Sequence, residues 1–139
     1  MTSSLSLTAP AVPRSAGEIR CIMRAHFEAL QLQQWQIADI LEASGEAALN
    51  VIEHAYSHLT KPGDLNVTAM ITDNTVILAI LDQGVWKTQP PRLGRGHGFE
   101  MMRGLAGRVS IKEDGEGTVV YMNFPLDAGG KSLLQQAAS

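Results

Sequence analysis

A carboxylate and an amide stand four residues apart in the segment 46–54, whose sequence predicts a helix. In an α-helix this spacing places Glu46 and Asn50 on one face, where both can reach a single ligand. A carboxylate can accept a proton, and an amide oxygen can bind a hard cation such as magnesium. His54 continues the same spacing. The pattern is typical of metal-dependent phosphate chemistry, although ordinary solvated helix faces also carry it.

Two shorter groups could complete a ligand site. Asp82-Gln83-Gly84 ends an apolar segment with an acid and a glycine. A carboxylate at this place can accept a hydrogen bond from an exocyclic amine, and the glycine lets backbone approach closely. Gly117-Thr118 opens the last predicted strand with a hydroxyl group. Taken singly, each group also fits an ordinary turn or strand start.

The segment 84–98 contains two prolines and four glycines, which predict a mobile loop. Near its end, glycines alternate with a cation and an imidazole in the order Gly94, Arg95, Gly96, His97, Gly98. A short helix, about 99–106, is expected to follow. Backbone N–H groups before a helix, together with a guanidinium group, can hold phosphates. The alternative is a loop that is merely flexible, with His97 as a solvated residue.

Composition limits the possible classes of protein. The chain has 139 residues, of which 45% are hydrophobic and 18% charged, so we expect a single domain over 1–139 with a core at about 15–126 and a polar C-terminal tail at 127–139. Because the net charge is −3, no basic footprint for nucleic acid is expected. Cys21 is the one cysteine, and its helical context predicts a buried thiol.

No apolar run approaches the length of a membrane span, and the N-terminus lacks the features of a signal peptide. These observations predict a soluble, cytoplasmic protein without a membrane partner.

Hydrophobic periodicity predicts helices followed by strand pairs. A capping box of Ser15 and Glu18 is expected to begin a helix at about 15–32, and a second helix is expected at about 35–57. The first should bury Ile19, Ile22, Met23, Phe27 and Leu30, and the second Ile37, Leu41, Ala48, Val51 and Ala55. Strands are predicted at 5–7, 66–72, 75–81, 109–112 and 118–124, with hairpin turns at 73–74 and 114–117. This order predicts an α+β fold, with one mixed, mainly antiparallel sheet and helices on one face.

In this order and at these separations, the motifs resemble the three boxes of the GHKL-type ATPases, and most closely the anti-sigma factor serine/threonine kinases of bacterial partner-switching systems. The segment 46–56 is similar to the N box, 82–84 to the first glycine box, 95–102 to the second, and 117–118 to the closing strand motif. The resemblance covers about residues 15–126. It implies the two-layer α/β sandwich of the histidine-kinase-like ATPase fold, with ATP and Mg²⁺ as cofactors.

The resemblance also implies roles for individual residues. Glu46 would be the general base, Asn50 the magnesium ligand, and Asp82 the group that binds the adenine amine. Gly84 would permit close approach to the base, and Thr118 would lie near the adenine. The other implied cofactor-binding positions are His54, Trp86, Gly94, Gly96, His97, Gly98 and Phe99. Arg95 is the candidate cation for the developing charge.

A protein of this kind would bind a sigma factor and phosphorylate a STAS-domain anti-sigma factor antagonist, and a homodimer is plausible. Trp86 departs from the family pattern, since a second glycine is common at its position. An indole there can cap the nucleotide, which we expect, or block it. The alternative is therefore a non-catalytic module of the same fold that sequesters a partner, with weak or structural nucleotide binding. The ATPase module of a sensor histidine kinase is a third possibility, less favoured because no phosphoacceptor helices precede the ATP-binding region.

Overall fold

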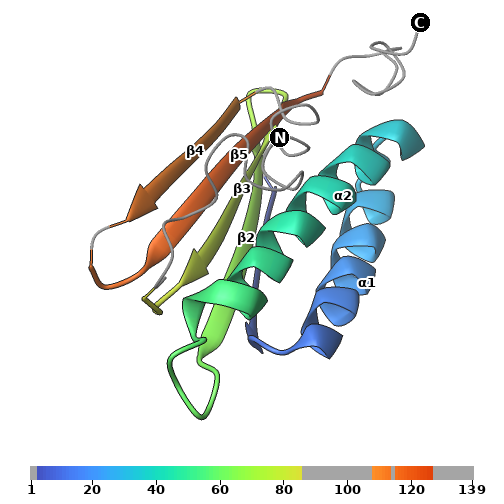
Figure 1. The fold of residues 1–139 in the computed structure, drawn as a ribbon. Helices are drawn as coiled ribbons and strands as arrows, with labels where there is room; N and C mark the ends of the chain where they lie inside the picture. The colour runs from blue at the N-terminus through green and yellow to red at the C-terminus, as the bar shows by residue number, and fades with distance from the viewer. Residues whose placement is uncertain (1–2, 86–107, 114, 127–139) are drawn as a thin grey trace, which may run out of the picture.

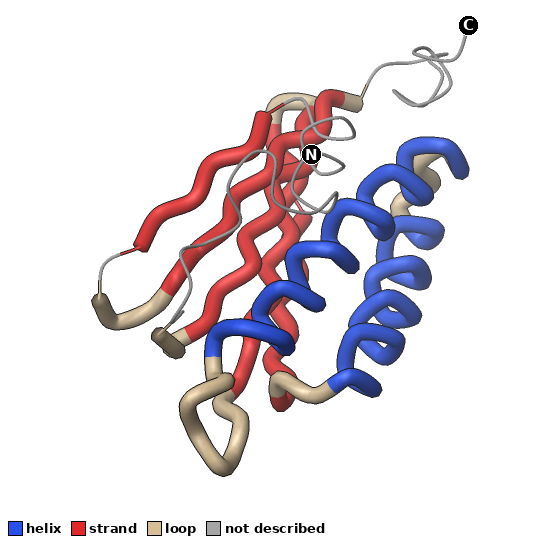
Figure 2. Tube along the Cα trace, in the orientation of Figure 1, coloured by secondary structure: helices blue, strands red, loops and turns tan. Residues whose placement is uncertain are grey.

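The computed structural model describes residues 3–85, 108–113 and 115–126, whose helices and strands form two layers (Figure 1). One layer is a five-stranded sheet in the order β1-β2-β3-β5-β4. Its strands are β1 (Ser3–Pro10), β2 (Asp64–Thr72), β3 (Thr75–Asp82), β4 (Arg108–Glu113) and β5 (Thr118–Pro125). Figure 2 shows the helices together on one face of this sheet. The predicted α+β sandwich is confirmed, and every strand pairing in the described residues is antiparallel.

The core lies between the two layers because the strands alternate. β3 buries Val76, Leu78 and Ile80 toward the helices, while the residues between them are only partly buried. β2 and β5 repeat this alternation, with Leu65, Val67 and Ala69 buried on one and Val120, Met122 and Phe124 on the other. A strand with one apolar face must cover that face with a second layer.

The first helix, α1 (Pro13–Ala29), begins earlier than the sequence predicts. Pro13 occupies its first turn, where the fixed φ of proline favours a helix start and the missing N–H costs nothing. Val12 is the N-cap, without a side-chain cap bond. Ser15 is therefore inside the helix and fully buried, so the predicted capping box with Glu18 is wrong.

The buried stripe of α1 consists of Ile19, Met23 and Phe27, four residues apart, as predicted. Cys21 is exposed, so the predicted buried thiol is wrong. Its position two residues after Ile19 turns it about 200° away from the stripe. Ile22 is 46% exposed, which contradicts its predicted core role, because it lies at the edge of a stripe that meets protein on one side only.

The second helix, α2 (Gln34–Asn50), starts with a capping box formed by Gln33 and Gln36, which the sequence analysis did not identify. The chain then continues as a five-residue π-helix, η1 (Val51–Ala55). The prediction of one continuous helix to residue 57 is therefore wrong beyond Asn50. The predicted apolar side is confirmed, since Ile37, Leu41, Ala48, Val51 and Ala55 are all buried.

The two hairpins set the register of the strand ends. Asp73 and Asn74 have φ angles of 50° and 59°, as a two-residue turn that matches strand twist requires. In the second hairpin Gly115 has a φ of 82°. The first turn places Asp82, at the end of β3, opposite Leu65 of β2. On its other side Asp82 pairs with Thr118 of β5.

Candidate functional site

The last two turns of α2 carry the predicted base and the predicted magnesium ligand. Glu46 and Asn50 both lie within the α-helical part of the chain, four residues apart, and both are half-buried. Neither side chain makes a hydrogen bond or an ion pair with another residue in the described parts of the chain. A half-buried carboxylate and a half-buried amide on one helical stripe can both face a ligand that covers this end of α2.

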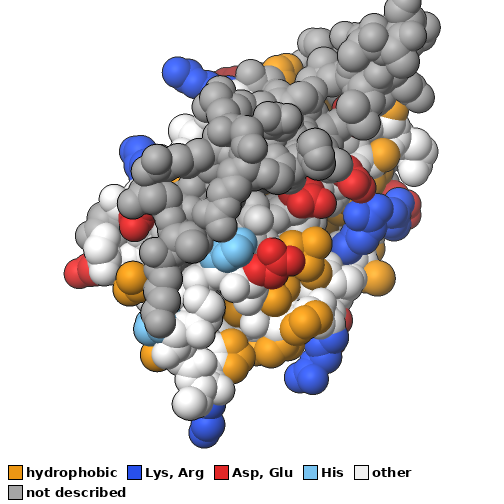
Figure 3. All heavy atoms as spheres, in the orientation of Figure 1, with side chains coloured by type: hydrophobic (Ala, Val, Ile, Leu, Met, Phe, Trp, Pro, Cys, Tyr) orange, Lys and Arg blue, Asp and Glu red, His pale blue; other side chains and the backbone are white. Residues whose placement is uncertain are grey.

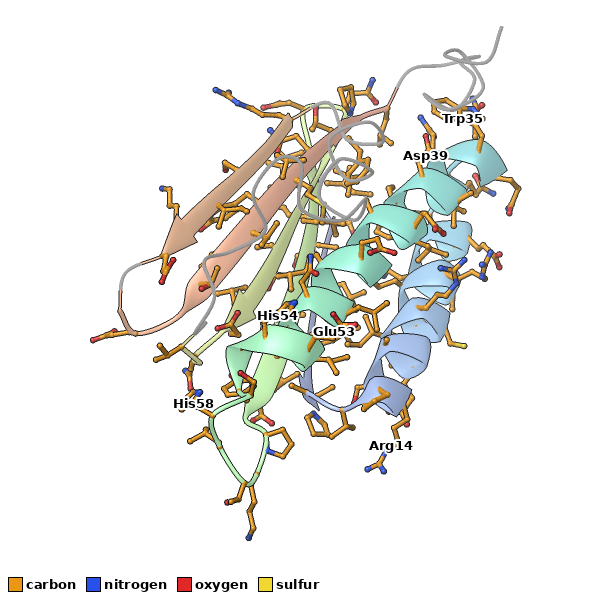
Figure 4. All side chains as sticks on the ribbon, in the orientation of Figure 1. Arg14, Trp35, Asp39, Glu53, His54 and His58 are labelled. Atoms are coloured by element: carbon orange, nitrogen blue, oxygen red, sulfur yellow. The ribbon has the colours of Figure 1, made fainter. Side chains whose placement is uncertain are left out.

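The helix changes character directly after Asn50. The five residues of η1 form a π-helix, a rare element that occurs frequently at functional sites. Because a π turn closes over one more residue than an α turn, the spacing from Asn50 to His54 is not the α-helical one that the sequence predicts. His54 Nε2 lies 3.6 Å from Glu53 Oε2, and Figure 4 shows both residues at the opposite end of the helix from Trp35 and Asp39.

The exit of β3 packs directly against the end of η1. Asp82 is only 5% exposed, and its Oδ1 accepts a hydrogen bond from the Gly84 N–H at 3.0 Å. The Val85 N–H then donates to the Ala55 carbonyl at 2.9 Å. A Cβ atom on Gly84 would lie 2.0 Å from this same Ala55 oxygen. Glycine is thus required at position 84 because backbone meets backbone there.

Tyr56 connects the same two elements through its side chain. Its hydroxyl accepts a hydrogen bond from the Gln83 N–H at 2.9 Å and donates one to the Asp64 carbonyl. Burial raises the pKa of this phenol above its ordinary value of 10.0; the bond from Gln83 lowers it in part, and the charges of Asp82 and Asp64 raise it further. Tyr56 lies in the segment that resembles the N box, but the sequence indicates no role for it, because hydrogen bonds between distant segments leave no local pattern.

The start of β5 lies opposite Asp82. Thr118 pairs with Asp82 in the sheet register and is 1% exposed. Its Oγ1 atom is buried and has no hydrogen-bond partner among the described residues. A Cβ atom on Gly117 would lie 2.0 Å from the Asp82 carbonyl oxygen, so this glycine too is required by a close backbone approach. A buried hydroxyl without a partner beside a buried carboxylate can accept a ligand's polar group.

The structure therefore brings the predicted residues of 46–54, 82–84 and 117–118 onto adjoining elements. Figure 3 shows acidic, histidine and hydrophobic side chains interspersed on the helical face of the molecule. The predicted site residues Trp86, Gly94, Arg95, Gly96, His97, Gly98 and Phe99, with the predicted helix at 99–106, lie outside the described residues.

The side chains of the described residues that could ligate a metal suit a magnesium ion that is bound together with phosphates. These residues contain no group of three or more His, Cys, Asp or Glu side chains that could hold a metal ion. Magnesium keeps most of its waters and takes only one or two protein ligands when phosphates supply the others. The amide oxygen of Asn50 fits that requirement.

Helices cover one face of an antiparallel sheet (Figure 2), and a carboxylate at a strand exit is held against a helix end. Residues 9–124 match the family model described as "Histidine kinase-like ATPase domain".

Two proteins named anti-sigma F factor are also similar to this chain. The one from Caldanaerobacter subterraneus subsp. tengcongensis is 34% identical over 100 residues, which are 63% of this chain and 68% of that protein. The one from Pasteuria penetrans is 27% identical over 106 residues, which are 67% of this chain and 71% of that protein. The chain belongs to the histidine kinase-like ATPase family and, within it, to the anti-sigma factors.

Two solved structures share the fold. The structure of the RsbU and RsbW domains of Rv1364c from Mycobacterium tuberculosis aligns with a TM-score of 0.76 at 24% identity, covering 93% of this chain and 34% of that one. This chain thus spans about a third of that longer protein. The histidine kinase domain of the blue-light activated histidine kinase EL346 from Erythrobacter litoralis aligns with a TM-score of 0.55 at 16% identity, covering 84% and 61%. Separately, no helix in the described segments is long and apolar enough to cross a membrane.

Proposed function

We propose that this protein binds ATP between the end of α2 and the exit of β3, and that it is an anti-sigma factor with serine/threonine kinase activity. The contact of Ala55 with Gly84 and Val85 is the observation that supports this most. It holds the helix that carries Glu46 and Asn50 against the strand that carries Asp82. The family match and the two anti-sigma F factors support the same assignment.

Each residue has a definite part in the proposed reaction. Asp82 accepts a hydrogen bond from the adenine amine, and the Thr118 hydroxyl, which has no partner among the described residues, lies beside it. Asn50 would hold magnesium, which would supply positive charge against the charge that develops on the phosphates. Glu46 takes the proton from the acceptor hydroxyl. Arg95 offsets charge on the transferred group. The phosphate lid consists of Gly94, Gly96 and Gly98, together with His97 and Phe99. Trp86 caps the nucleotide.

The relatives' name supports one of the proposed partners, the sigma factor. An anti-sigma factor binds a sigma factor, and the kinase acceptor is a serine or threonine of a STAS-domain antagonist. A phosphate adds nearly two negative charges to a packed interface, and desolvation with repulsion then separates the partners. This chain's net charge of −3 adds to the repulsion. A homodimer, without nucleic acid or membrane, is the proposed assembly.

Calorimetric titration with ATP and ADP, with and without magnesium, tests the binding site. Wild-type protein should bind ATP with magnesium, while Asp82→Asn and Asn50→Ala should each weaken binding about tenfold or more, because each removes a hydrogen bond or a metal ligand. Absence of binding to folded wild-type protein would contradict the proposal and favour a module that only sequesters its partner.

A phosphotransfer assay with a STAS-domain acceptor tests the chemistry. Glu46→Gln should lower kcat by about 10²–10⁴-fold, as loss of a general base does, and leave ATP affinity nearly unchanged. Glu42→Gln is the matched control, because Glu42 is exposed one turn earlier on α2. Equal activity of the two variants would rule out Glu46 as the base.

A further inference from the structure

Three segments distant in sequence meet at the hydroxyl of Tyr56. The residue follows η1 directly, and its two hydrogen-bond partners are Asp64 at the start of β2 and Gln83 after the end of β3. Its side chain is buried, with only 7% of the residue exposed. A phenol can accept one hydrogen bond and donate another, and here it does both.

The backbone beyond Asp82 is held by three successive N–H groups. The N–H of Gln83 donates to Tyr56 Oη, that of Gly84 to Asp82 Oδ1, and that of Val85 to the Ala55 carbonyl. Two of these three acceptors come from the adjacent residues 55 and 56. The exit of β3 is therefore fixed in place by the end of the helix that carries Asn50.

The Tyr56 ring is itself confined. A Cβ atom on Gly63 would lie 2.4 Å from its Cε1 atom, so glycine leaves the space that the ring fills. The Gly63 carbonyl also accepts a hydrogen bond from the Ala11 N–H at 2.9 Å. The Tyr56 hydroxyl is thus held in one position, which lets its hydrogen bond set the orientation of the peptide group between Asp82 and Gln83.

We propose that Tyr56 is a positioning residue for nucleotide recognition, acting through its hydrogen bond to the peptide group that follows Asp82. This inference rests on the proposed function, in which Asp82 binds the adenine amine. The bond sets the direction of the Asp82 side chain, so its loss lowers affinity for ATP and discrimination against a purine without that amine. A residue that served only to fill space would need the ring and not the hydroxyl.

Tyr56→Phe separates these two roles because it keeps the ring and removes the hydroxyl. The control is Tyr121→Phe, on the opposite face of the sheet, whose ring lies 5.8 Å from Lys112 Nζ. In nucleotide-free protein, amide hydrogen exchange at Gln83 should become about tenfold faster in Tyr56→Phe and stay unchanged in the control. Overall folding is checked by circular dichroism; if Tyr56→Phe is too unstable, Gly17→Ala provides a stabilised background.

Nucleotide binding then decides the proposal. Tyr56→Phe should raise the Kd for ATP about fivefold to tenfold and reduce the preference for ATP over ITP, with kcat at saturating ATP within about twofold of wild type. In a protein that already carries Asp82→Asn, Tyr56→Phe should change the Kd for ATP very little, because both changes act on one contact. Unchanged ATP affinity in Tyr56→Phe, or additive effects with Asp82→Asn, would overturn the proposal. If wild-type protein binds no ATP, the proposed function fails first and this inference fails with it.

Discussion

Gly84 is the residue that most directly limits the distance between the exit of β3 and η1. A Cβ atom there would meet the Ala55 carbonyl oxygen at 2.0 Å, a contact that no side-chain rotation can relieve. Gly84→Ala should therefore destabilise the protein by about 1–3 kcal/mol and weaken ATP binding by displacing Asp82. Chemical denaturation and calorimetry measure the two effects.

Gly17→Ala is the control for that change. Gly17 lies in α1, where an added Cβ atom would meet nothing within 4 Å. Alanine at an exposed helical position should stabilise the protein by about 0.5–1 kcal/mol and leave ATP affinity unaltered. If both glycine variants behaved alike, the close approach of residue 84 to η1 would not be a constraint in solution.

Thr118 offers a test in which stability and binding move in opposite directions. Its Oγ1 atom is buried without a partner in the described structure, and such a group costs free energy in the nucleotide-free protein. Thr118→Val keeps the shape and should leave the free energy of unfolding equal or raise it by about 1 kcal/mol. ATP affinity should fall about fivefold, because the hydroxyl lost is one that the nucleotide would use.

Thr118→Ser supplies the reverse comparison. It keeps the hydroxyl and removes a buried methyl group, so it should cost about 1 kcal/mol of stability while ATP affinity is maintained. Lower stability of Thr118→Val would mean that the hydroxyl has a partner within the protein. ATP affinity equal to that of wild type would mean that the hydroxyl has no part in binding.

At the scale of elements, the capping box of α2 lies at the opposite end of the helix from the proposed site. Gln36 is buried, and its Oε1 accepts a hydrogen bond from the Gln33 N–H at 3.3 Å, which closes the capping box. Gln36→Ala should cost about 1 kcal/mol of stability and leave ATP affinity unchanged, because Asn50 lies about 21 Å along the helix axis. Urea denaturation measures the stability.

Gln34→Ala is the matched control, since Gln34 is exposed in the first turn of the same helix. A surface change of this kind should stay within about 0.5 kcal/mol of wild type. A loss of ATP affinity in Gln36→Ala would mean that the two ends of α2 are coupled.

The elements also show how far sequence reasoning reaches. The ends of β2, β3 and β5 were predicted to within two residues, because alternating burial is a local signal. The π-helix after Asn50 was not predicted, since it depends on packing against the sheet. The early start of α1 at Pro13 was not predicted either, since it depends on the burial of Ser15. At the site, the family resemblance identified Asp82 and Thr118 as residues near the adenine, but the sequence did not show that the two pair directly across β3 and β5.

At the scale of the whole molecule, one sheet and one helix layer bring together groups that lie far apart in the chain. The three candidate groups at 46–54, 82–84 and 117–118 adjoin because β3 pairs with β5 and the end of η1 meets the exit of β3. Through its hydrogen bond to the Asp64 carbonyl, Tyr56 also connects the contact between η1 and the exit of β3 to the start of β2. Stability of the fold and geometry of the proposed site therefore depend on the same hydrogen bonds.

The pH dependence of unfolding tests this link. The pKa of Tyr56 is raised above 10.0 in the folded protein, chiefly by burial. Below pH 10 the phenol is protonated in both folded and unfolded chains, so its contribution to stability is complete. As pH rises beyond that value, the unfolded chain releases the proton first, and the free energy of unfolding falls until pH passes the raised pKa of the folded state.

Tyr56→Phe cannot release this proton, so its stability should fall less steeply than that of wild type above pH 10. The stability difference between the two proteins, measured by urea denaturation from about pH 8 to pH 11, should therefore shrink at the alkaline end. Wild-type ATP affinity should fall only as pH passes the raised pKa of the folded state, because an ionised Tyr56 can no longer donate to the Asp64 carbonyl. A difference in stability that stays constant with pH would show that the phenol is already solvated in the folded protein, and would remove the physical basis for its role at the exit of β3.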